Sequence, residues 1–280
     1  MHAVEQNKLS RLREILSRYN KVVIGFSGGI DSSLLLKVAV LTLGGDNVWA
    51  VTGDSESLVP EELQFCRDLA GKIGLSPGNF IEVKTGELAN PDYRKNPINR
   101  CYYCKSELFD RLLDFAAGVE ADAVLDGSNA DDVLDWRPGR QAASQRGVVS
   151  PLAEAGVTKQ EIREMAREFG LPNWDKPALA CLSSRIPYGS EVTMEKLDKI
   201  ARAEKFLRSL GFSQTRVRYH DKIARIELLK DELPRMFENG LYEKVADELK
   251  SLGFSYVTVD LKGYRSGSMN EGINSKGEDE

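Results

Sequence analysis

The stretch 26–33 of the chain reads FSGGIDSS and joins two apolar runs of different character. The run before it, 21–26 (KVVIGF), is rich in β-branched side chains, which is typical of a buried parallel strand. The run after it, 34–41, continues as a helix. The stretch is therefore predicted to be a strand-to-helix turn, in which Gly28 and Gly29 let the backbone turn tightly and approach a ligand.

This turn is expected to bind an anion, and phosphate is the most suitable one. The first N–H groups of a helix have no partner within the helix, and its dipole places partial positive charge at the same end. The stretch lacks the Gly-Lys-Ser/Thr ending of a P-loop and is not Gly-x-Gly-x-x-Gly, so the usual kinase, GTPase and dinucleotide sites are not predicted. The plainer alternative is an Asp or Ser residue that only caps the helix.

FSGGIDSS resembles the PP-loop of the ATP pyrophosphatase superfamily, whose members bind ATP and cleave it to AMP and pyrophosphate. The resemblance implies that the loop and its serines hold the pyrophosphate and that Asp31 holds a magnesium ion (Mg2+). The ATP-binding residues implied in the loop are Ser27, Gly28, Gly29, Asp31, Ser32 and Ser33.

Length and composition are those of an ordinary globular protein. The 280 residues suffice for one large or two smaller domains, and 41% of them are hydrophobic and 29% charged. The net charge of −5 counts against a general nucleic-acid binder. The chain has no run of about 18 uncharged apolar residues, the length that a membrane span needs, and the N-terminus has no apolar signal region. A cytoplasmic protein without a membrane partner is therefore expected.

Strand and helix patterns alternate along the first part of the chain, which predicts an α/β fold with a doubly wound parallel sheet. Residues 133–157 are expected to be rich in loops. Asp126 and Gly127 follow the fourth strand, at the sheet edge that carries the PP-loop, and carboxylates there suit a magnesium nucleotide. The expected elements are a helix at 3–19, strands at 21–26, 48–51, 80–83 and 121–126, and helices at 60–74 and from 101 to about 117.

The composition changes near residue 189, where a domain boundary is predicted. The first domain is 1–189, the second is 190–270, and the polar stretch 271–280 is expected to be a disordered tail. LRSLGFS at 207–213 recurs as LKSLGFS at 249–255, and each copy reads as a helix, a glycine stop and a strand. The second domain is therefore predicted to be a small α+β unit with an antiparallel sheet.

Two placements of charge in this domain are unfavourable unless they have partners. Glu204 falls in the apolar stripe of a helix at 193–210, which points to a metal or a polar network, with a salt bridge to an arginine as the plainer alternative. A hairpin turning at 220–221 would pair Arg216 with Arg225 and place Arg218 on the same face. Like charges there predict a bound anion such as a substrate phosphate, although Glu227 would neutralise part of the charge and a solvated face is the alternative. Arg265, after the last strand, is a further candidate phosphate donor.

Three of the four cysteines are candidates for metal or redox chemistry. Cys101 and Cys104 form a CxxC pair at the start of a helix, and Cys181 lies in a proline-punctuated segment. Three thiolates on a [4Fe–4S] cluster would leave one iron open for a further ligand. Cys66 falls in the apolar stripe of its helix and is expected to be a buried thiol.

Several further stretches make the whole chain similar to the LarE family of ATP-dependent sulfur transferases, which build the nickel-pincer nucleotide cofactor of lactate racemase. They are LDGSNADDVLDWRPGR (125–140), SPLAEAGVTKQEIR (150–163), LPNWDKPALACLSSRIPYG (171–189), RVRYHDKIARIEL (216–228) and GYRSGSMN (263–270). The resemblance implies adenylation of a carboxylate of pyridinium-3,5-biscarboxylic acid mononucleotide by Mg-ATP, followed by conversion to a thiocarboxylate with release of AMP. It also implies a homo-oligomer.

The resemblance places Cys181 at the position that donates sulfur and the arginines at the phosphate of the nucleotide substrate. In one branch of the family a single cysteine gives up its own sulfur and becomes dehydroalanine. In the other, which this sequence resembles in having CxxC and the cysteine of ACLSSR, a [4Fe–4S] cluster carries an extra sulfide. The sulfur donor, sulfide or another compound, stays open at this point.

Three other functions remain as alternatives. A PP-loop enzyme that thiolates tRNA would bind RNA, which the net acidity disfavours. An amide-forming ligase of the NAD or GMP synthetase kind would use ammonia and would need no cysteine. A regulatory protein that binds a nucleotide or zinc would release no pyrophosphate.

Overall fold

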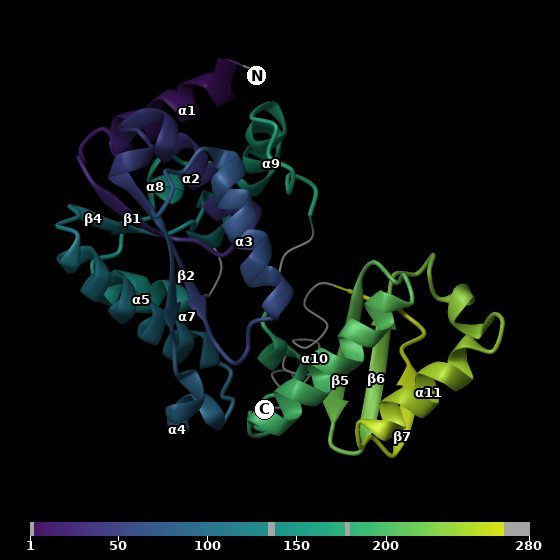
Figure 1. Cartoon of the computed structure of the whole chain (residues 1–280). Coiled ribbons are helices and arrows are strands. Elements are labelled where there is room, and N and C mark those ends of the chain that lie inside the picture. Colours follow the sequence, from purple (N-terminus) through teal and green to yellow (C-terminus); the bar gives the residue numbers. More distant parts are fainter. Residues whose placement is uncertain (1–2, 134–137, 177–179, 266–280) are drawn as a thin grey trace, which may run out of the picture. The chain divides into compact units, whose positions relative to one another are not determined.

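The computed structural model describes residues 3–133, 138–176 and 180–265, and these form two compact units (Figure 1). The first unit holds the chain up to Tyr93 and again from Asn99 to Leu179, and the second holds Arg94–Ile98 and the chain from Ala180 onward. The second unit therefore begins earlier than the predicted boundary at 189, and it takes a short segment from within the first. The predicted tail at 271–280 lies outside the described residues.

The first unit is built on a four-stranded parallel sheet with the strand order β3-β2-β1-β4. This confirms the predicted doubly wound α/β fold. The chain leaves β1 toward β2 and later returns to its other side as β4, and ligands of such sheets bind where the strand order reverses, beyond the carboxyl ends. The strands are β1 (Val22–Gly25), β2 (Val48–Asp54), β3 (Phe80–Lys84) and β4 (Ala123–Leu125).

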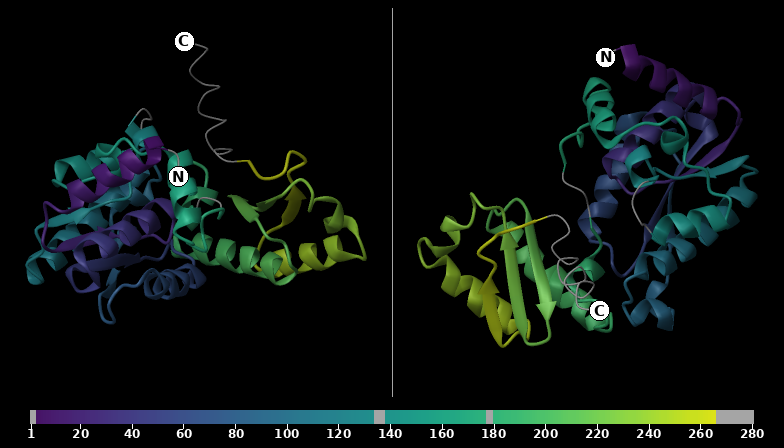
Figure 2. Two further views of the ribbon diagram at one scale, coloured as in Figure 1. Left: turned by 90° about the horizontal axis from the view of Figure 1, so that it is seen from above. Right: turned by 180° about the vertical axis from the view of Figure 1, so that it is seen from behind.

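Alternate side chains of the strands enter two apolar layers, one on each face of the sheet. Val22 and Ile24 belong to a cluster with helices α1 (Ala3–Leu16), α2 (Ile30–Leu43), α3 (Pro60–Ile73) and α9 (Lys159–Glu168). Val23 belongs to the cluster on the other face, with α5 (Arg100–Gly118) and α7 (Pro138–Gln145). Figures 1 and 2 show helices on both faces of the strands. Five short elements complete the unit: η1 (Gly45–Asn47), η2 (Glu87–Ala89), α4 (Pro91–Arg94), α6 (Ala130–Val133) and α8 (Pro151–Glu154).

The segment 133–157 is more ordered than the sequence predicted. Its described part contains α7 and α8, and Val149 pairs with Leu125 beside β4. A Cβ atom at Gly139 would lie 3.1 Å from Cγ of Lys105 in α5, so the glycine permits close packing of the two helices. Pro138 and Gly139 therefore begin a helix that packs on α5.

The second unit has a three-stranded sheet with the order β5-β6-β7, in which β5 and β6 are antiparallel and β6 and β7 are parallel. The prediction of an antiparallel sheet is therefore wrong for β7, because α11 connects β6 to β7 and a helical crossover returns the chain in the same direction. The elements are η3 (Leu182–Arg185), α10 (Met194–Ser209), β5 (Thr215–His220), β6 (Ile223–Leu228), η4 (Pro234–Phe237), α11 (Leu241–Ser251) and β7 (Tyr256–Val259).

The internal duplication is visible in the structure of this unit. Gly211 follows α10 with φ +86°, and Gly253 follows α11 with φ +97°. Positive φ at these two positions ends each helix, and a strand follows in each copy. Both helices share one apolar cluster with the sheet, so each repeat contributes a helix and a strand to the same core.

The turn of the hairpin lies one residue further along the chain than predicted, so the two strands pair in a different register. Arg218 lies opposite Arg225, and Arg216 lies opposite Glu227. The predicted pair of Arg216 with Arg225 is wrong because the turn is centred on 221–222 and not on 220–221, with Asp221 at φ +53°. Arg216 and Arg218 still share a face, since they are two residues apart on one strand.

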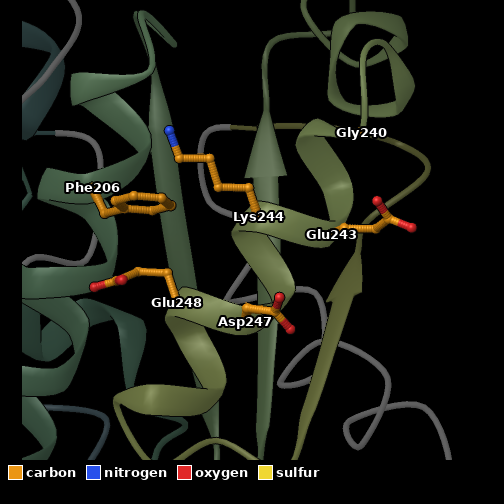
Figure 3. Close-up of a pocket in the computed structure, with 6 residues that line it drawn as sticks. All are labelled: Phe206, Gly240, Glu243, Lys244, Asp247 and Glu248. Atoms are coloured by element: carbon orange, nitrogen blue, oxygen red, sulfur yellow. The ribbon is translucent and has the colours of Figure 1, made fainter.

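A groove between α10 and α11 has a volume of about 570 Å³. Figure 3 shows the residues that line it. Its lining residues do not include any predicted site residue; they are Phe206, Gly240, Glu243, Lys244, Asp247 and Glu248. Among the helices that the structure describes, none combines the length and apolar character needed to cross a membrane.

Candidate nucleotide and sulfur-transfer site

The PP-loop turns directly from β1 into α2. Gly28 adopts φ +67°, and a Cβ atom there would lie 2.7 Å from Sγ of Cys66, so both conformation and space require glycine. Gly29 caps α2 and has no side chain to occupy the N–H groups of the first helical turn. This end of α2 can therefore receive an anion through its backbone, as the sequence predicted.

The serines of the loop bind one another and the loop backbone. Oγ of Ser27 lies 3.2 Å from Oγ of Ser32. The hydroxyls of Ser32 and Ser33 donate to the carbonyl of Gly29 at 3.0 Å and 2.8 Å. Ser27 is exposed and Ser32 and Ser33 are buried, so Ser27 is the serine most open to a ligand.

Asp31 in the first turn of α2 has two partners in this unit. Nζ of Lys159 lies 2.5 Å from Oδ2, and Nδ2 of Asn129 donates to Oδ1 at 3.2 Å. Lys159 is the first residue of α9 and follows Thr158, which forms a capping box with Glu161. The sequence analysis missed Lys159 as a site residue, because Lys159 meets Asp31 only through the tertiary fold.

The loop after β4 lies against the start of α2. A Cβ atom at Gly127 would lie 2.9 Å from the backbone nitrogen of Ser32, so the structure brings Gly127 to the PP-loop. Asp126 is buried and orders its own loop: Oδ1 accepts from Oγ of Ser150 at 2.6 Å, and Oδ2 accepts from Oγ of Ser128 at 2.8 Å.

Asn173 is a second residue that the sequence analysis did not single out. It is 1% exposed, and its amide donates to the carbonyl of Gly28 at 2.9 Å and to Oγ of Ser33 at 3.0 Å. Asn173 therefore fixes the glycine turn through contacts with residues that are distant in the sequence. Its only signal in the sequence is its place in the stretch LPNWDKP.

The cysteines separate into one buried thiol and three that are accessible at least in part. Cys66 is buried, and desolvation raises the pKa of its thiol to about 11, so it is the inert thiol that its helical stripe predicted. Cys101 is exposed and Cys104 is half-buried in the first turn of α5, where Sγ of Cys104 donates to the buried Glu87 at 3.5 Å. Cys181 is exposed directly before η3 in the second unit.

Glu204 forms a buried ion pair in the second unit. Its two carboxylate oxygens accept from Nε and Nη2 of Arg185 at 2.8 Å and 3.0 Å, and Oε1 also accepts from the backbone N–H of Val217 at 3.0 Å. This is the salt bridge that the sequence left open as the alternative to a metal site, and it occupies both oxygens. We therefore propose no metal ion at Glu204.

The arginines of the hairpin face are linked through shared carboxylates. Arg218 and Arg225 both contact Glu227, at 2.8 Å and 3.3 Å. Arg225 and Arg265 both contact Asp260, at 2.6 Å and 3.4 Å. Glu227 thus neutralises part of the charge, as the sequence analysis foresaw.

Arg216 differs from the other arginines of this face. It is 9% exposed, its Nη1 donates to the neighbouring carbonyl of Thr215 at 2.8 Å, and its guanidinium lies 5.4 Å from the ring centre of Tyr264. Within the described part of the chain no carboxylate forms an ion pair with it. Burial, together with the charge of Arg185, lowers the pKa of the Arg216 guanidinium, so its environment opposes its charge.

Among the described residues, the arginine network of this face carries excess positive charge. It contains more arginines than carboxylates, and an anion is the ligand that would balance it. The members are Arg216, Arg218, Arg225 and Arg265 with Glu227 and Asp260.

Comparison with known proteins identifies the family of the chain. A family model described as NAD synthase matches residues 6–87, which contain the PP-loop and the first three strands. The chain is 42% identical to pyridinium-3,5-bisthiocarboxylic acid mononucleotide synthase of Lactiplantibacillus plantarum, over 94% of each chain. The chain belongs to the family of this synthase. It is also 46% identical to protein slr1717 of Synechocystis over 95% of this chain and 97% of the relative, and 30% identical to protein MJ0830 of Methanocaldococcus jannaschii over 92% and 98%.

Cysteine thiolates are the ligands of [4Fe–4S] clusters, and three of the four cysteines are accessible at least in part. Cys101 and Cys104 lie three residues apart in one helical turn, so their thiols share a face of α5, and Cys181 is exposed. Cys66 is unsuited to ligation because it is buried and its thiol pKa is raised. Within the described residues no three His, Cys, Asp or Glu side chains gather as a metal site, and Cys181 belongs to the other unit, which is described by itself.

Proposed function

We propose that this chain is an ATP-dependent sulfurtransferase that adenylates a carboxylate of pyridinium-3,5-biscarboxylic acid mononucleotide and converts it to a thiocarboxylate. The observation that carries the proposal is the 42% identity to the bisthiocarboxylic acid mononucleotide synthase over 94% of the chain, which includes most of both units. The PP-loop geometry of the first unit and the arginine network of the second, in which arginines outnumber the described carboxylates, support it independently.

In the first half-reaction, a carboxylate oxygen of the substrate attacks the α-phosphorus of ATP and pyrophosphate leaves. The N–H groups at the start of α2 and the Ser27 hydroxyl would hold the leaving pyrophosphate. Lys159, drawn to this point by Asp31, supplies a positive charge beside it. Asp31 would hold the magnesium ion that accompanies ATP, and the ion would neutralise phosphate charge.

In the second half-reaction, a sulfur nucleophile attacks the acyl carbon of the adenylate and AMP leaves. Adenylation makes this attack feasible because a free carboxylate has no adequate leaving group. Cys181 is our choice for the position from which sulfur is delivered, since it is an exposed thiol on the same unit as the arginine network. A cluster held by Cys101, Cys104 and Cys181 would supply an open iron for an exogenous sulfide.

A cysteine that gives up its own sulfur is the other route. There Sγ of Cys181 forms the C–S bond to the acyl carbon, and loss of the Cα proton then breaks the Cβ–S bond, leaving dehydroalanine in the chain and the thiocarboxylate as product. The two routes differ in what they leave behind, because only this one converts Cys181.

Arg216 is the residue that we place at the phosphate of the nucleotide substrate, with Arg218, Arg225 and Arg265 around it. The other three already have carboxylate partners, so they orient the site, whereas Arg216 needs an anion. A cytoplasmic homo-oligomer that acts on a small molecule and binds no nucleic acid completes the proposal.

Pyrophosphate release tests the first half-reaction. Purified protein is incubated with ATP and magnesium, with and without the dicarboxylate nucleotide, and with tRNA or ammonia as competing acceptors. We expect release only with the dicarboxylate nucleotide, and its loss in Asp31→Asn. Release that depends on tRNA or ammonia instead would contradict the proposal and support one of the other PP-loop functions.

A further inference from the structure

The turn that carries Cys181 is short and depends on outside support. The carbonyl of Cys181 accepts from the N–H of Ser184 at 3.0 Å, which closes one turn of η3. A four-residue 3₁₀ turn has poorer hydrogen-bond geometry than an α-helix and little stability of its own. Its position must therefore be fixed by the residues that contact it.

Arg185 supplies that support from within the turn. Its Nη1 donates to the carbonyls of Ala180 and Cys181 at 2.5 Å and 2.9 Å, and to Oγ of Ser184 at 3.1 Å. Its other two nitrogens bind both carboxylate oxygens of Glu204 in α10. The planar guanidinium thus holds the backbone at Cys181 with one edge and a helix with the other.

Glu204 is itself fixed to the framework of the unit. It accepts from the N–H of Val217, whose side chain lies in the apolar core. Arg185 and Glu204 are 2% and 1% exposed, and a buried ion pair of this kind adds little stability because both ions lose their hydration. What the pair achieves is a fixed link from α10 and β5 to the backbone of Cys181.

We propose that Arg185 is a positioning residue for sulfur transfer, which holds the backbone of residues 180 and 181 so that the Cys181 thiol is presented in one place. This inference rests on the proposed role of Cys181. Arg218 adds a second tie, because its Nη1 donates to the carbonyl of Ser184 at 3.0 Å, so the arginine network and the cysteine turn share a contact.

The test compares Arg185→Lys and Arg185→Gln with the wild type. A lysine keeps the charge beside Glu204 but cannot also donate to the carbonyls of residues 180 and 181. We expect substrate-dependent pyrophosphate release to stay within about twofold, while thiocarboxylate formation falls roughly 10- to 100-fold because small misplacements of a reacting group are costly. Hydrogen exchange should accelerate in a peptide covering 181–186 and stay unchanged in β5 and β6.

Arg208→Lys is the matched control. Arg208 also contacts Glu204, at 3.7 Å, but among the described residues it donates to none of the carbonyls at 180–184. We expect wild-type pyrophosphate release, sulfur transfer and hydrogen exchange in this variant.

Wild-type sulfur transfer and exchange in both Arg185 variants would overturn the inference. A parallel fall of adenylation, transfer and melting temperature would also overturn it, since it would show a purely structural role. Failure of the wild type to form thiocarboxylate would instead contradict the proposed function, and the exchange data would still decide whether Arg185 holds the turn.

Discussion

Arg216 is the residue whose surroundings point most directly to a ligand. A buried guanidinium without an ion-pair partner in the described part of the chain pays for its desolvation unless an anion joins it. The neighbouring arginines share two carboxylates and can accept less additional charge. The proposed phosphate is therefore assigned to Arg216 and not to the whole face.

Arg216→Ala should raise the KM for the nucleotide substrate by about tenfold or more, because a charge-assisted contact to phosphate is lost. ATP binding measured by titration calorimetry should not change, since the PP-loop lies in the other unit. Arg202→Ala is the control, because Arg202 is an exposed arginine of α10 paired only loosely with Asp198 at 3.6 Å. An unchanged KM in Arg216→Ala would show that the phosphate binds elsewhere.

Asn173→Ala should weaken ATP binding by about tenfold, because the carbonyl of Gly28 and the hydroxyl of Ser33 lose the amide that fixes them. Calorimetric titration with ATP measures the effect. Asn79→Ala is matched to it, since Asn79 also donates to loop carbonyls of the first unit, those of residues 45, 46 and 48. The control should lower the melting temperature and leave ATP affinity unchanged; equal affinity in both variants would argue against the role of Asn173.

Cys66 gives a prediction about pH. Its folded-state pKa of about 11 lies above the ordinary value of 9.0, so the folded state favours the neutral thiol. The contribution to the free energy of unfolding is therefore fully present below pH 9 and is lost as the pH rises from 9 to about 11. Across this window the unfolding free energy of the wild type should fall relative to that of Cys66→Val. A constant difference between the two proteins would contradict the assignment.

At the scale of elements, the N-terminal turn of α2 packs directly against Gly127 in the loop after β4. Gly127→Ala would place a Cβ atom 2.9 Å from the backbone nitrogen of Ser32, and backbone on both sides cannot yield easily. We expect ATP affinity to fall by roughly tenfold and the melting temperature to drop. Gly118→Ala, at the end of α5 with open space around it, should leave ATP affinity unchanged and should not lower the melting temperature. A normal ATP affinity in Gly127→Ala would show that the loop does not shape the nucleotide site.

The sequence was informative about elements wherever the signal was local. Hydrophobic periodicity located α2, α3 and α10. The hairpin register was missed by one turn position, because Asp221 adopts a left-handed conformation that residue type alone does not dictate. The direction of β7 was missed because it depends on the crossover through α11 and not on the strand itself.

The site residues that sequence reasoning missed are those whose partners are far along the chain. Lys159 meets Asp31 and Asn173 meets Gly28 only after the sheet has formed. Glu204 was recognised as anomalous, but its partner, Arg185, needed the structure to be named. A buried charge can thus be detected from a helical stripe, whereas the identity of its counter-ion depends on tertiary contacts.

At the scale of the whole molecule, the chemistry is divided between the two units. The first holds the PP-loop with Cys101 and Cys104, and the second holds Cys181 with the arginine network. The chain passes between the units more than once, since Arg94–Ile98 joins the second. The proposed adenylation therefore uses groups of the first unit, and the proposed sulfur delivery and phosphate recognition use groups of the second.

The central claim is that Cys181 delivers sulfur to a carboxylate that the PP-loop unit has activated. The most direct measurement is mass spectrometry of the substrate after anaerobic incubation of wild type and Cys181→Ala with ATP, magnesium and sulfide. We predict that the wild type exchanges one carboxylate oxygen for sulfur and that Cys181→Ala releases pyrophosphate but forms no thiocarboxylate. Equal thiocarboxylate formation by Cys181→Ala would contradict this account.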